Sequence, residues 1–274
     1  MSAGGTLAAG SLSLSQIDVE RLAVRVDEAA RNRCAITKIT DDYPEMTWAD
    51  AYAVQERLRE KFEERGEETG LLFKAGLTSH AKMEQMGVTE PVFGFLSSKG
   101  RYAAGDEVLC SQYIHPRIEA EIALTTSSEL SGPDCTVEDV MEAIGEAASA
   151  IEIIDSRYID FKFDLKSVIA DNTSAAGWAL GKLKPVDFSL DLPNLNLRLR
   201  INGKEVAAVK GEAVLGNPAC SVAMLVNHLH SLGRTLPKGS VILTGGASAA
   251  FGVEPGDRIE LEVDQLGPLT LRFV

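Results

Sequence analysis

The sequence predicts a mixed α+β fold, with a central, largely antiparallel β body, helices around it and a helical cap at the N-terminus. Residues 1–66 carry helix-start signals followed by apolar residues at helical spacing. Residues 67–274 instead carry short apolar runs broken by Gly, Pro and Asp, together with an Asn-Gly hairpin signal. We therefore expect a helical cap region over 1–66 and a β domain over 67–274, which is long enough to bury a large core.

Two helices are expected in the cap region. The first stretch, 15–33, opens with Ser15 and Asp18, the pattern of a capping box, and continues with apolar residues at roughly helical spacing. The second repeats the pattern with Thr47 and Asp50 and ends in charged residues before a glycine. Together they predict a helical layer that covers another part of the molecule.

Two further helices are expected in the first half of the β domain. "SHAKMEQMG", residues 79–87, predicts a helix of one or two turns between strands. "TVEDVMEAIGEAASA", residues 136–150, predicts a long helix that starts at Thr136, with Asp139 completing the start signal. It runs directly into the apolar "IEIID", residues 151–155, so a helix followed at once by a strand is the simplest interpretation.

Antiparallel pairing and one more helix are expected in the C-terminal half. "LNLRLRINGKEVAAV" alternates apolar and polar residues up to a turn at Asn202-Gly203, the strongest short hairpin signal. "NPACSVAMLVNHLHSLG" predicts a helix capped by Asn217, with Pro218 at its first position and an apolar face that covers a sheet. The last residues predict a strand, a Gly-rich loop and a hairpin with the arms "RIELEV" and "LTLRFV".

Composition and charge limit the possible functions. Asp and Glu number 40 against 27 Lys and Arg, and the formal charge of -13 repels nucleic acid and anionic lipid. An anionic substrate therefore requires local cations or a metal. The chain start lacks the pattern of a signal peptide and no window is apolar enough for a membrane span, so we expect a cytoplasmic protein. The cysteines form no C-x-x-C pair and are expected to be buried, reduced thiols: Cys34, Cys110, Cys135 and Cys220.

Two glutamates stand two positions apart in the apolar segment "HPRIEAEIAL", residues 115–124. In a strand, Glu119 and Glu121 point the same way, and their charges repel unless a cation lies between them. A hard divalent metal such as Mg²⁺ resolves that repulsion, because it binds carboxylates and leaves positions open for substrate oxygens. The alternative is an exposed strand face on which both acids are solvated.

Two more charged residues interrupt apolar runs. Glu152 lies in "AIEIID", and a buried glutamate needs a partner or a metal, so it is a candidate third ligand. Lys74 in "LLFKAGL" is a lone cation, and a desolvated lysine can shuttle a proton or hold an anion. The alternative for Lys74 is a buried stem whose ammonium group reaches solvent.

Two polar loops are candidates for a pocket wall. The Gly-rich "ILTGGASAAFG", which contains Thr244, could hold an anion on backbone N–H groups or only form a tight turn. "VIADNTSAAG" offers Asp171, Asn172 and Ser174, either as a pocket wall or as a structured turn. Nucleotide-binding, zinc-protease and serine-hydrolase motifs are missing from the sequence, which disfavours those classes.

Four segments in the same order resemble the fumarylacetoacetate hydrolase superfamily, specifically its hydratase and decarboxylase branch. They are "LFKAGLTSHAKMEQMGVTEPVFGFL", "IHPRIEAEIAL", "IEIIDSRYIDFKFDLKSVIADNTSAAG" and "ILTGGASAAFGVEPGDRIELEV". The resemblance implies a β-roll catalytic domain over 67–274, a Mg²⁺ or Mn²⁺ cofactor and a homo-oligomer. It makes Lys74 the catalytic cation and assigns the metal ligands Glu119, Glu121 and Glu152. The substrate-binding residues that it implies are Val92, Asp171, Ser174 and Thr244.

Val92 bears on the reaction that the resemblance implies. Related hydratases usually carry "PDFG" where this chain has "PVFG", and the missing Asp is implicated in handling protons during water addition. Loss of CO₂ is instead helped by an apolar, poorly solvated neighbourhood. The resemblance therefore implies decarboxylation of 2-oxo-3-hexenedioate to 2-hydroxypenta-2,4-dienoate, a reaction of aromatic catabolism.

Three alternatives to that reaction remain open. They are hydration of 2-hydroxypenta-2,4-dienoate, C–C hydrolysis of an acylpyruvate, and a non-catalytic subunit that binds a partner hydratase. The chain also departs from the family pattern at Asn217, where a His is expected, and at Glu212, where a small residue is expected. Glu212 would disfavour a dicarboxylate if it faced the pocket, and a surface position is the alternative.

Overall fold

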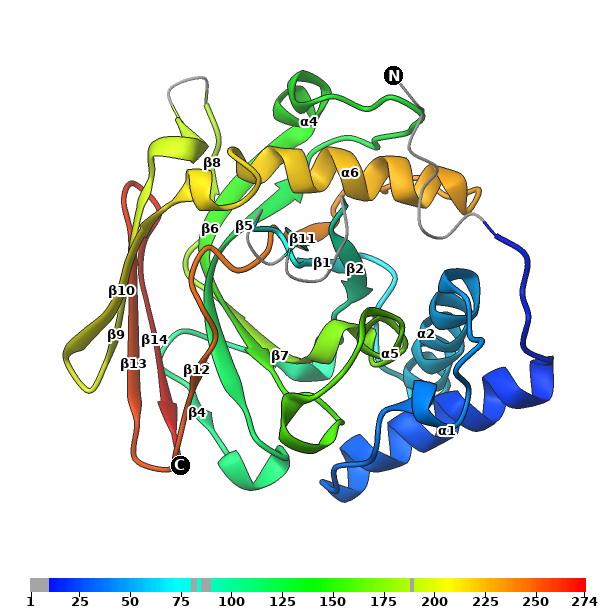
Figure 1. The fold of residues 1–274 in the computed structure, drawn as a ribbon. Coiled ribbons are helices and arrows are strands. Elements are labelled where there is room, and N and C mark those ends of the chain that lie inside the picture. The colour runs from blue at the N-terminus through cyan, green and yellow to red at the C-terminus, as the bar shows by residue number, and fades with distance from the viewer. Residues whose placement is uncertain (1–9, 80–82, 85–89, 188–189) are drawn as a thin grey trace.

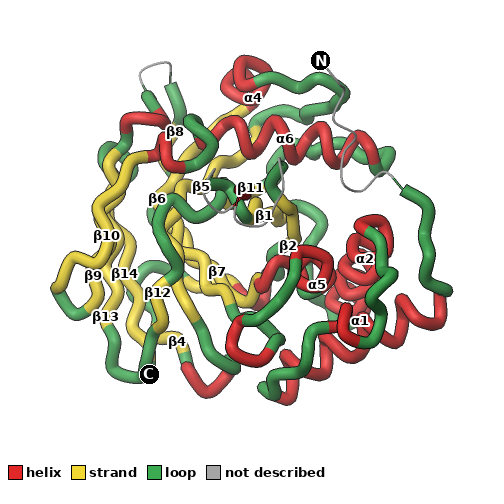
Figure 2. Tube along the Cα trace, in the orientation of Figure 1, coloured by secondary structure: helices red, strands yellow, loops and turns green. Residues whose placement is uncertain are grey.

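The computed structural model describes residues 10–79, 83–84, 90–187 and 190–274. Within these ranges, a nine-stranded mixed sheet curls into a half-barrel, and a five-stranded sheet packs against it. The N-terminal helices lie on the side opposite the smaller sheet, and other helices lie across one end of the half-barrel (Figures 1 and 2). Most of the strand pairs are antiparallel, so the predicted α+β fold with a largely antiparallel β-roll is confirmed.

The elements have the following bounds. The helices are α1 (Gln16–Asn32), α2 (Trp48–Glu64), α4 (Val137–Ala143), α5 (Leu165–Ala170) and α6 (Pro218–Ser231). The large sheet runs in the order β2 (Val92–Phe95), β1 (Leu72–Gly76), β11 (Val241–Leu243), β5 (Arg117–Thr126), β6 (Ile144–Ile154), β7 (Ala175–Leu180) and β3 (Arg101–Tyr102), with β12 (Phe251–Gly252) beside β5 and β8 (Lys184–Pro185) beside β6. The small sheet runs in the order β10 (Lys204–Lys210), β9 (Asn196–Ile201), β13 (Arg258–Val263), β14 (Gly267–Phe273) and β4 (Glu107–Val108).

Both helices predicted in the cap region are confirmed, with the start signals in place. The Ser15 hydroxyl accepts the Asp18 N–H at the start of α1. Thr47 and Asp50 form a complete capping box at the start of α2, in which each side chain accepts the other residue's backbone N–H. These bonds satisfy N–H groups that a helix start leaves without an intrahelical partner.

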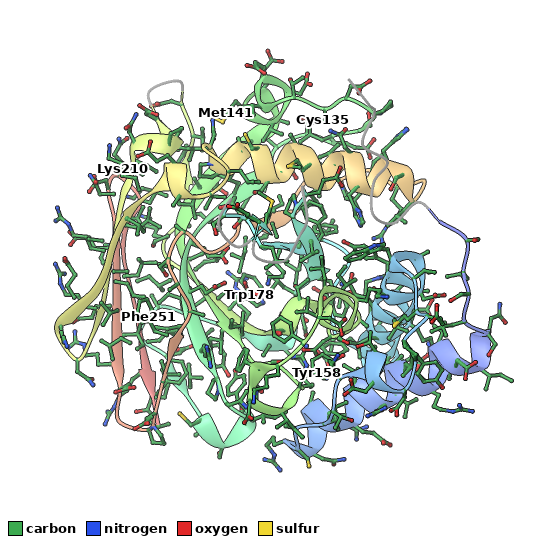
Figure 3. All side chains as sticks on the ribbon, viewed as in Figure 1. Cys135, Met141, Tyr158, Trp178, Lys210 and Phe251 are labelled. Carbon is green, nitrogen blue, oxygen red and sulfur yellow. The ribbon has the colours of Figure 1, made fainter. Side chains whose placement is uncertain are left out.

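The cap helices share a hydrophobic core with the β domain. One cluster of buried residues joins α1 and α2 to α5 and to the site-bearing strand β2, and it includes the fully buried Tyr158 (Figure 3). The Tyr158 hydroxyl donates to the carbonyl of Ser167 in α5 at 2.9 Å. Residues 1–66 and 67–274 therefore pack on each other closely, and the division of the chain between them stays a prediction.

The long helix predicted over residues 136–150 is wrong in its second half. Its start is confirmed, because Thr136 and Asp139 form the predicted capping box, but α4 ends at Ala143 and the chain continues as β6. The segment "IGEAASA" has good helix formers, but β6 pairs with β5 on one side and with β7 on the other. These ladders override local propensity, and small side chains let the strand pack closely on both faces.

The C-terminal half follows the prediction closely. The turn between β9 and β10 lies at Asn202 and Gly203, which both have positive φ angles, 53° and 76°. Asn217 caps α6 by accepting the Ala219 N–H at 2.9 Å. The helix lies across one end of the half-barrel next to α4 (Figure 1), and the hairpin β13–β14 is paired along its whole length.

Three other expectations have different outcomes. The short helix predicted over 79–87 lies mostly outside the described residues. All four cysteines are free, but only Cys135 is buried; Cys34 is exposed and the other two are half-buried, so the expectation of four buried thiols is wrong. No helix among the described residues is long and apolar enough to cross a membrane.

Candidate active site

The strand register brings three glutamates together inside the curl of the large sheet. Glu119 on β5 lies directly across from Glu152 on β6, and Glu152 lies across from Trp178 on β7. Glu121 follows Glu119 by two positions and so points from the same face. Trp178 lies within the half-barrel (Figure 3), which shows that this face is the inner one.

The three carboxylates are buried and close to one another. Glu119 is 8% exposed and Glu121 and Glu152 are 0% exposed, which excludes the alternative of a solvated strand face. Each residue offers a carboxylate oxygen, and these atoms all lie within 4.8 Å of one another. An apolar cluster from the same part of the sheet packs beside them: Leu96, Ala123, Ala150, Trp178, Leu180 and Leu243.

Two of these oxygens lack a hydrogen-bond partner among the described residues. Glu121 Oε2 accepts the Gly245 N–H at 2.8 Å and Glu152 Oε1 lies 3.0 Å from Lys74 Nζ, but Glu121 Oε1 and Glu152 Oε2 accept no hydrogen bond. Buried carboxylate oxygens without donors are costly unless a cation binds them. Three hard oxygen donors converging in this way fit a Mg²⁺ or Mn²⁺ ion, so the residues present match the predicted cofactor.

Burial changes the acidity of this cluster. It raises the pKa of Glu121 well above the usual value for glutamate, and the charges of Glu152 and Glu119 raise it further. Burial also raises the pKa of Glu152 to about 7, although the neighbouring Lys74 ammonium acts in the opposite direction. In the metal-free protein the cluster therefore retains a proton near neutral pH, and a metal ion must displace it.

A Gly-Gly pair in the loop after β11 closes the cluster from one side. An ideal Cβ on Gly246 would lie 2.7 Å from the carboxyl carbon of Glu119, so a larger residue would push that side chain. Gly245 has a φ of +106°, and a Cβ there would lie 2.2 Å from Thr78 Oγ1. The backbone of the Gly-rich loop donates to the protein's own Glu121, and the interpretation of the loop as a binding site for an external anion stays a prediction.

Lys74 on β1 faces the same cluster. Its ammonium group lies 3.0 Å from Glu152 Oε1 and donates to the carbonyl oxygen of Thr173 at 3.1 Å. The residue is only 2% exposed, which excludes the alternative in which the ammonium reaches solvent. A desolvated cation is therefore held at the edge of the carboxylate cluster, where it can stabilise negative charge on a bound molecule.

The polar segment after α5 forms a buried, structured turn. Asp171 is fully buried and forms an ion pair with Arg157, and the Ser174 hydroxyl donates to Asp171 at 3.3 Å. Burial raises the pKa of Asp171 to about 6, against the lowering effect of the Arg157 charge. The carbonyl of Thr173 in this turn reaches Lys74, so the turn borders the site, whereas substrate contacts for Asp171 and Ser174 stay predictions.

Val92 and Thr244 are both buried beside the cluster. An ideal Cβ on Gly76 would lie 3.4 Å from Val92 Cγ2 and 3.6 Å from the Lys74 Nζ, so the valine borders the space around the ammonium group. The Thr244 hydroxyl donates to the carbonyl of Ile122 at 2.8 Å, which ties the start of the Gly-rich loop to β5. Their predicted contacts with substrate stay predictions.

Neither of the two departures from the family pattern is a member of the carboxylate cluster. Glu212 is exposed in a short turn after β10, which supports the surface alternative. Asn217 acts as the cap of α6. Neither observation puts a fourth negative charge at the site.

Two features of the site were missed at the sequence level. They are the Arg157 partner of Asp171 and the Thr173 carbonyl. A signal existed for Arg157, because it is a single cation in the apolar stretch "IEIIDSRYI". The Thr173 contact uses a backbone atom, which every residue carries, so no side-chain pattern marks it.

A family model described as fumarylacetoacetate (FAA) hydrolase C-terminal matches residues 71–274. A 4-oxalocrotonate decarboxylase of Pseudomonas putida is 45% identical over 263 residues, which cover 96% of this chain and 99% of that protein. A 2-hydroxyhexa-2,4-dienoate hydratase of Comamonas testosteroni is 34% identical over 257 residues, covering 93% and 97% of the two chains.

A solved structure is similar over the same length. The 4-oxalocrotonate decarboxylase from Pseudomonas putida G7, complexed with magnesium and adipate, superimposes with a TM-score of 0.93. Its sequence is 43% identical, and the match covers 96% of this chain and 100% of the other. That protein thus binds magnesium and a six-carbon dicarboxylate on the same fold.

Proposed function

This chain belongs to the fumarylacetoacetate hydrolase family, and from that premise we propose that it is a metal-dependent decarboxylase, a carbon–carbon lyase. Its substrate in this proposal is 2-oxo-3-hexenedioate, also called 4-oxalocrotonate, and its products are CO₂ and 2-hydroxypenta-2,4-dienoate. The chain's similarity to 4-oxalocrotonate decarboxylases at 45% and 44% identity supports the reaction. The observation that carries the proposal is the buried cluster of Glu119, Glu121 and Glu152 beside Lys74.

The metal in this proposal is Mg²⁺ or Mn²⁺, held by Glu119, Glu121 and Glu152. When bound, such an ion supplies a Lewis acid for the 2-oxo carboxylate end of the substrate and offsets the charge of a dianion in an acidic protein. The Gly245 N–H supports this assignment, because it fixes one oxygen of Glu121 and leaves the other free of hydrogen bonds. The Glu121 carboxyl group is thereby oriented before any ion arrives.

Lys74 supplies a positive charge on the protein side of the reaction. As the C5–C6 bond of the substrate breaks and CO₂ leaves, the electron pair of that bond moves through the C3=C4 bond toward the C2 oxygen. The Lys74 ammonium, 2% exposed, is available to stabilise that charge, and an ammonium in a dry site acts more strongly than one in water. The proposed role of Lys74 is thus charge stabilisation at the developing dienolate.

Val92 is proposed to favour decarboxylation because its side chain has no polar or ionisable group. It borders the space around the Lys74 ammonium, where a hydratase of this family usually has an Asp. A buried valine cannot place or activate water, and it solvates a neighbouring carboxylate poorly, which favours loss of CO₂ over addition of water. The proposed roles of Asp171, Ser174 and Thr244 are to complete the pocket wall around the substrate.

The direct test supplies purified protein with 2-oxo-3-hexenedioate and Mg²⁺ and measures CO₂ release, before and after chelation. We expect metal-dependent CO₂ release with 2-hydroxypenta-2,4-dienoate as the accompanying product. Protein that is folded and metal-loaded but releases no CO₂ would refute the proposal. The similarity to a hydratase at 34% identity supports a hydratase as the alternative. Product analysis after incubation with the dienoate tests it, because hydration consumes the dienoate without releasing CO₂.

The assembly and location of the enzyme are further parts of the proposal. We expect a homo-oligomer, to be measured by light scattering, and a complex with the hydratase that consumes the product, to be tested by co-purification of the two proteins. The chemistry supports that complex, because the product of one reaction is the substrate of the other. The four free cysteines support a reducing, cytoplasmic location.

A further inference from the structure

The turn that contacts Lys74 has an unusual backbone. Asn172, Thr173 and Ser174 are consecutive residues with φ angles of 50°, 51° and 60°, all in the left-handed region. For residues other than glycine this region is strained, so a run of three persists only where surrounding contacts enforce it. Backbone strain of this kind beside a functional group points to a functional role for the turn.

A buried ion pair clamps both ends of this turn. Arg157 is 4% exposed, and its guanidinium donates to the side chain and to the carbonyl of Asp171, the residue before the turn. The same guanidinium donates to the carbonyl of Ala175, the residue after the turn, at 2.9 Å. One rigid, planar cation therefore fixes the entry and the exit of the three strained residues.

The Asn172 side chain ties the turn to strand β2. Its Oδ1 accepts the Phe95 N–H at 2.9 Å and its Nδ2 donates to the Phe95 carbonyl at 2.8 Å. The approach is close, because an ideal Cβ on the preceding Gly94 would lie 2.6 Å from Asn172 Oδ1. The turn is thus fixed to the sheet that carries Lys74 through β1, the neighbour of β2.

These contacts fix the position of one backbone carbonyl. Thr173 lies in the middle of the turn, and its oxygen accepts a hydrogen bond from Lys74 Nζ at 3.1 Å while that nitrogen lies 3.0 Å from Glu152 Oε1. A lysine side chain has four rotatable bonds and a freely rotating ammonium group, so it needs an external acceptor to stay in one place. Thr173 provides that acceptor without adding a charge.

We infer that Arg157, Asp171 and Asn172 are positioning residues, which hold the 172–174 turn in its left-handed form so that the Thr173 carbonyl sets the place of the Lys74 ammonium. This inference deepens the proposed function and rests on it for the role of Lys74. The three residues act through the turn and through Lys74. Misplacing a reacting group by about 1 Å can cost about 100-fold in rate. Loss of the contacts that position Lys74 should therefore lower kcat measurably.

Asn172→Ala is the test variant, and the chain offers a matched control in Asn202→Ala. Asn202 also has a left-handed φ, 53°, and its side chain also makes two hydrogen bonds, to Asp257 and to the Arg258 N–H. It lies in the small sheet, away from the site. Asn172→Ala should lose more thermal stability than Asn202→Ala, because Asn172 is buried and Asn202 is exposed, and only Asn172→Ala should lower kcat, by roughly 10- to 100-fold with KM nearly unchanged. Equal kcat values in the two variants would overturn the inference.

Asn172→Gly separates the backbone from the side chain. Glycine adopts the left-handed region without strain but makes neither bond to Phe95. If the left-handed backbone places the Thr173 carbonyl, Asn172→Gly should recover part of the kcat that Asn172→Ala loses. A glycine variant with a kcat as low as the alanine variant's, together with the same Mn²⁺ affinity, would overturn the role given to the backbone.

A second readout needs no substrate and decides the inference even if the proposed function fails. Free Mn²⁺ is followed by electron paramagnetic resonance during titration of the wild type, Asn172→Ala, Lys74→Met and the double variant. Because the Lys74 ammonium competes with metal for Glu152, Lys74→Met should raise Mn²⁺ affinity. Asn172→Ala should also raise it by releasing Lys74, but should have no further effect once Lys74 is Met.

The two proposals therefore fail in different ways. If the effects of Asn172→Ala and Lys74→Met on Mn²⁺ affinity simply add, or if Asn172→Ala has none, the positioning role is wrong whatever the enzyme's activity. If the wild type releases no CO₂ but the two substitutions are coupled in Mn²⁺ binding, the proposed reaction is wrong and the positioning role stands.

Discussion

At the residue scale, the chemistry of the site depends on a few buried charges. Glu119, Glu121 and Glu152 were predicted as ligands because E-x-E and a lone buried glutamate are expensive without a cation, and the structure brings their carboxylates within reach of one another. What one sequence could not supply was the set of contacts from Arg157 and Thr173. Residue type says how costly a buried charge is, whereas its partner depends on how distant segments meet.

Glu121→Gln tests the proposed metal site formed by Glu119, Glu121 and Glu152. The amide keeps the shape of the side chain but removes a charge from a fully buried position, so the metal-free protein should stay folded with equal or higher thermal stability. Mg²⁺ affinity should fall by roughly 100-fold, because an anionic ligand is lost. Calorimetric titration measures this, with the exposed Glu262→Gln as control. Undiminished Mg²⁺ binding by Glu121→Gln would show that the ligand assignment is wrong.

Val92→Asp tests the choice of reaction. An aspartate beside the Lys74 ammonium should offset its positive charge and so weaken the stabilisation of the developing dienolate, so we expect CO₂ release to slow by roughly 10- to 100-fold. Val92→Asn is the control of similar size without charge, and it separates the effect of the charge from that of a polar group. Rates of CO₂ release and of dienoate hydration are measured for both variants. Wild-type CO₂ release by Val92→Asp would contradict the proposed role of this position.

At the element scale, local signals predicted the starts of elements better than their ends. The capping boxes at Thr47 and Thr136 and the Asn202-Gly203 turn lie where the sequence placed them, because each signal is a bond made within a few residues. The end of α4 was wrong by seven residues, since 136–150 was expected to be helical and the helix stops at Ala143. Pairing of β6 with β5 and β7 decides that boundary, and those strands are distant in the sequence.

Gly246→Ala tests the Gly-rich loop that lies against the proposed metal ligand Glu119. The added Cβ would press on the Glu119 carboxylate, a flexible end that can move, so the fold should survive with little loss of stability. The displaced ligand should weaken Mg²⁺ binding by roughly 10-fold. Gly252→Ala is the control, because an ideal Cβ there meets nothing within 4 Å. Equal Mg²⁺ affinities of the two variants, measured by titration, would mean that the loop does not restrain Glu119.

At the scale of the whole molecule, charge and site act together. The formal charge of -13 attracts divalent cations and repels a dianion, and the buried acids add to that field until a metal is bound. We therefore expect the metal to bind before the substrate. Repulsion among the buried acids, which protons or a bound metal relieve, also makes the stability of the whole fold depend on pH and on metal.

The metal-free protein should become less stable as the pH rises. The pKa of Glu152 is about 7 in the folded chain, against an ordinary value of 4.5, so between these values the folded state binds more protons than the unfolded state. The free energy of unfolding therefore falls over that interval. Melting curves in the presence of a chelator measure this, and Mg²⁺ at about 100 times its Kd should restore about 2.7 kcal/mol. A chelated protein whose stability is constant or rises from pH 5 to 7 would contradict the expectation.

The strand order of the large sheet has a consequence for how the protein matures. Lys74 lies on β1, the acids lie on β5 and β6, and the Gly245 N–H follows β11, which is inserted between β1 and β5. Since a ribosome makes the chain from its N-terminus, β11 is among the last strands to be synthesised, and these non-local pairings form slowly. A nascent chain that has not yet formed β11 therefore lacks the Gly245 contact to Glu121. The metal site reaches its final form only when β11 joins the sheet.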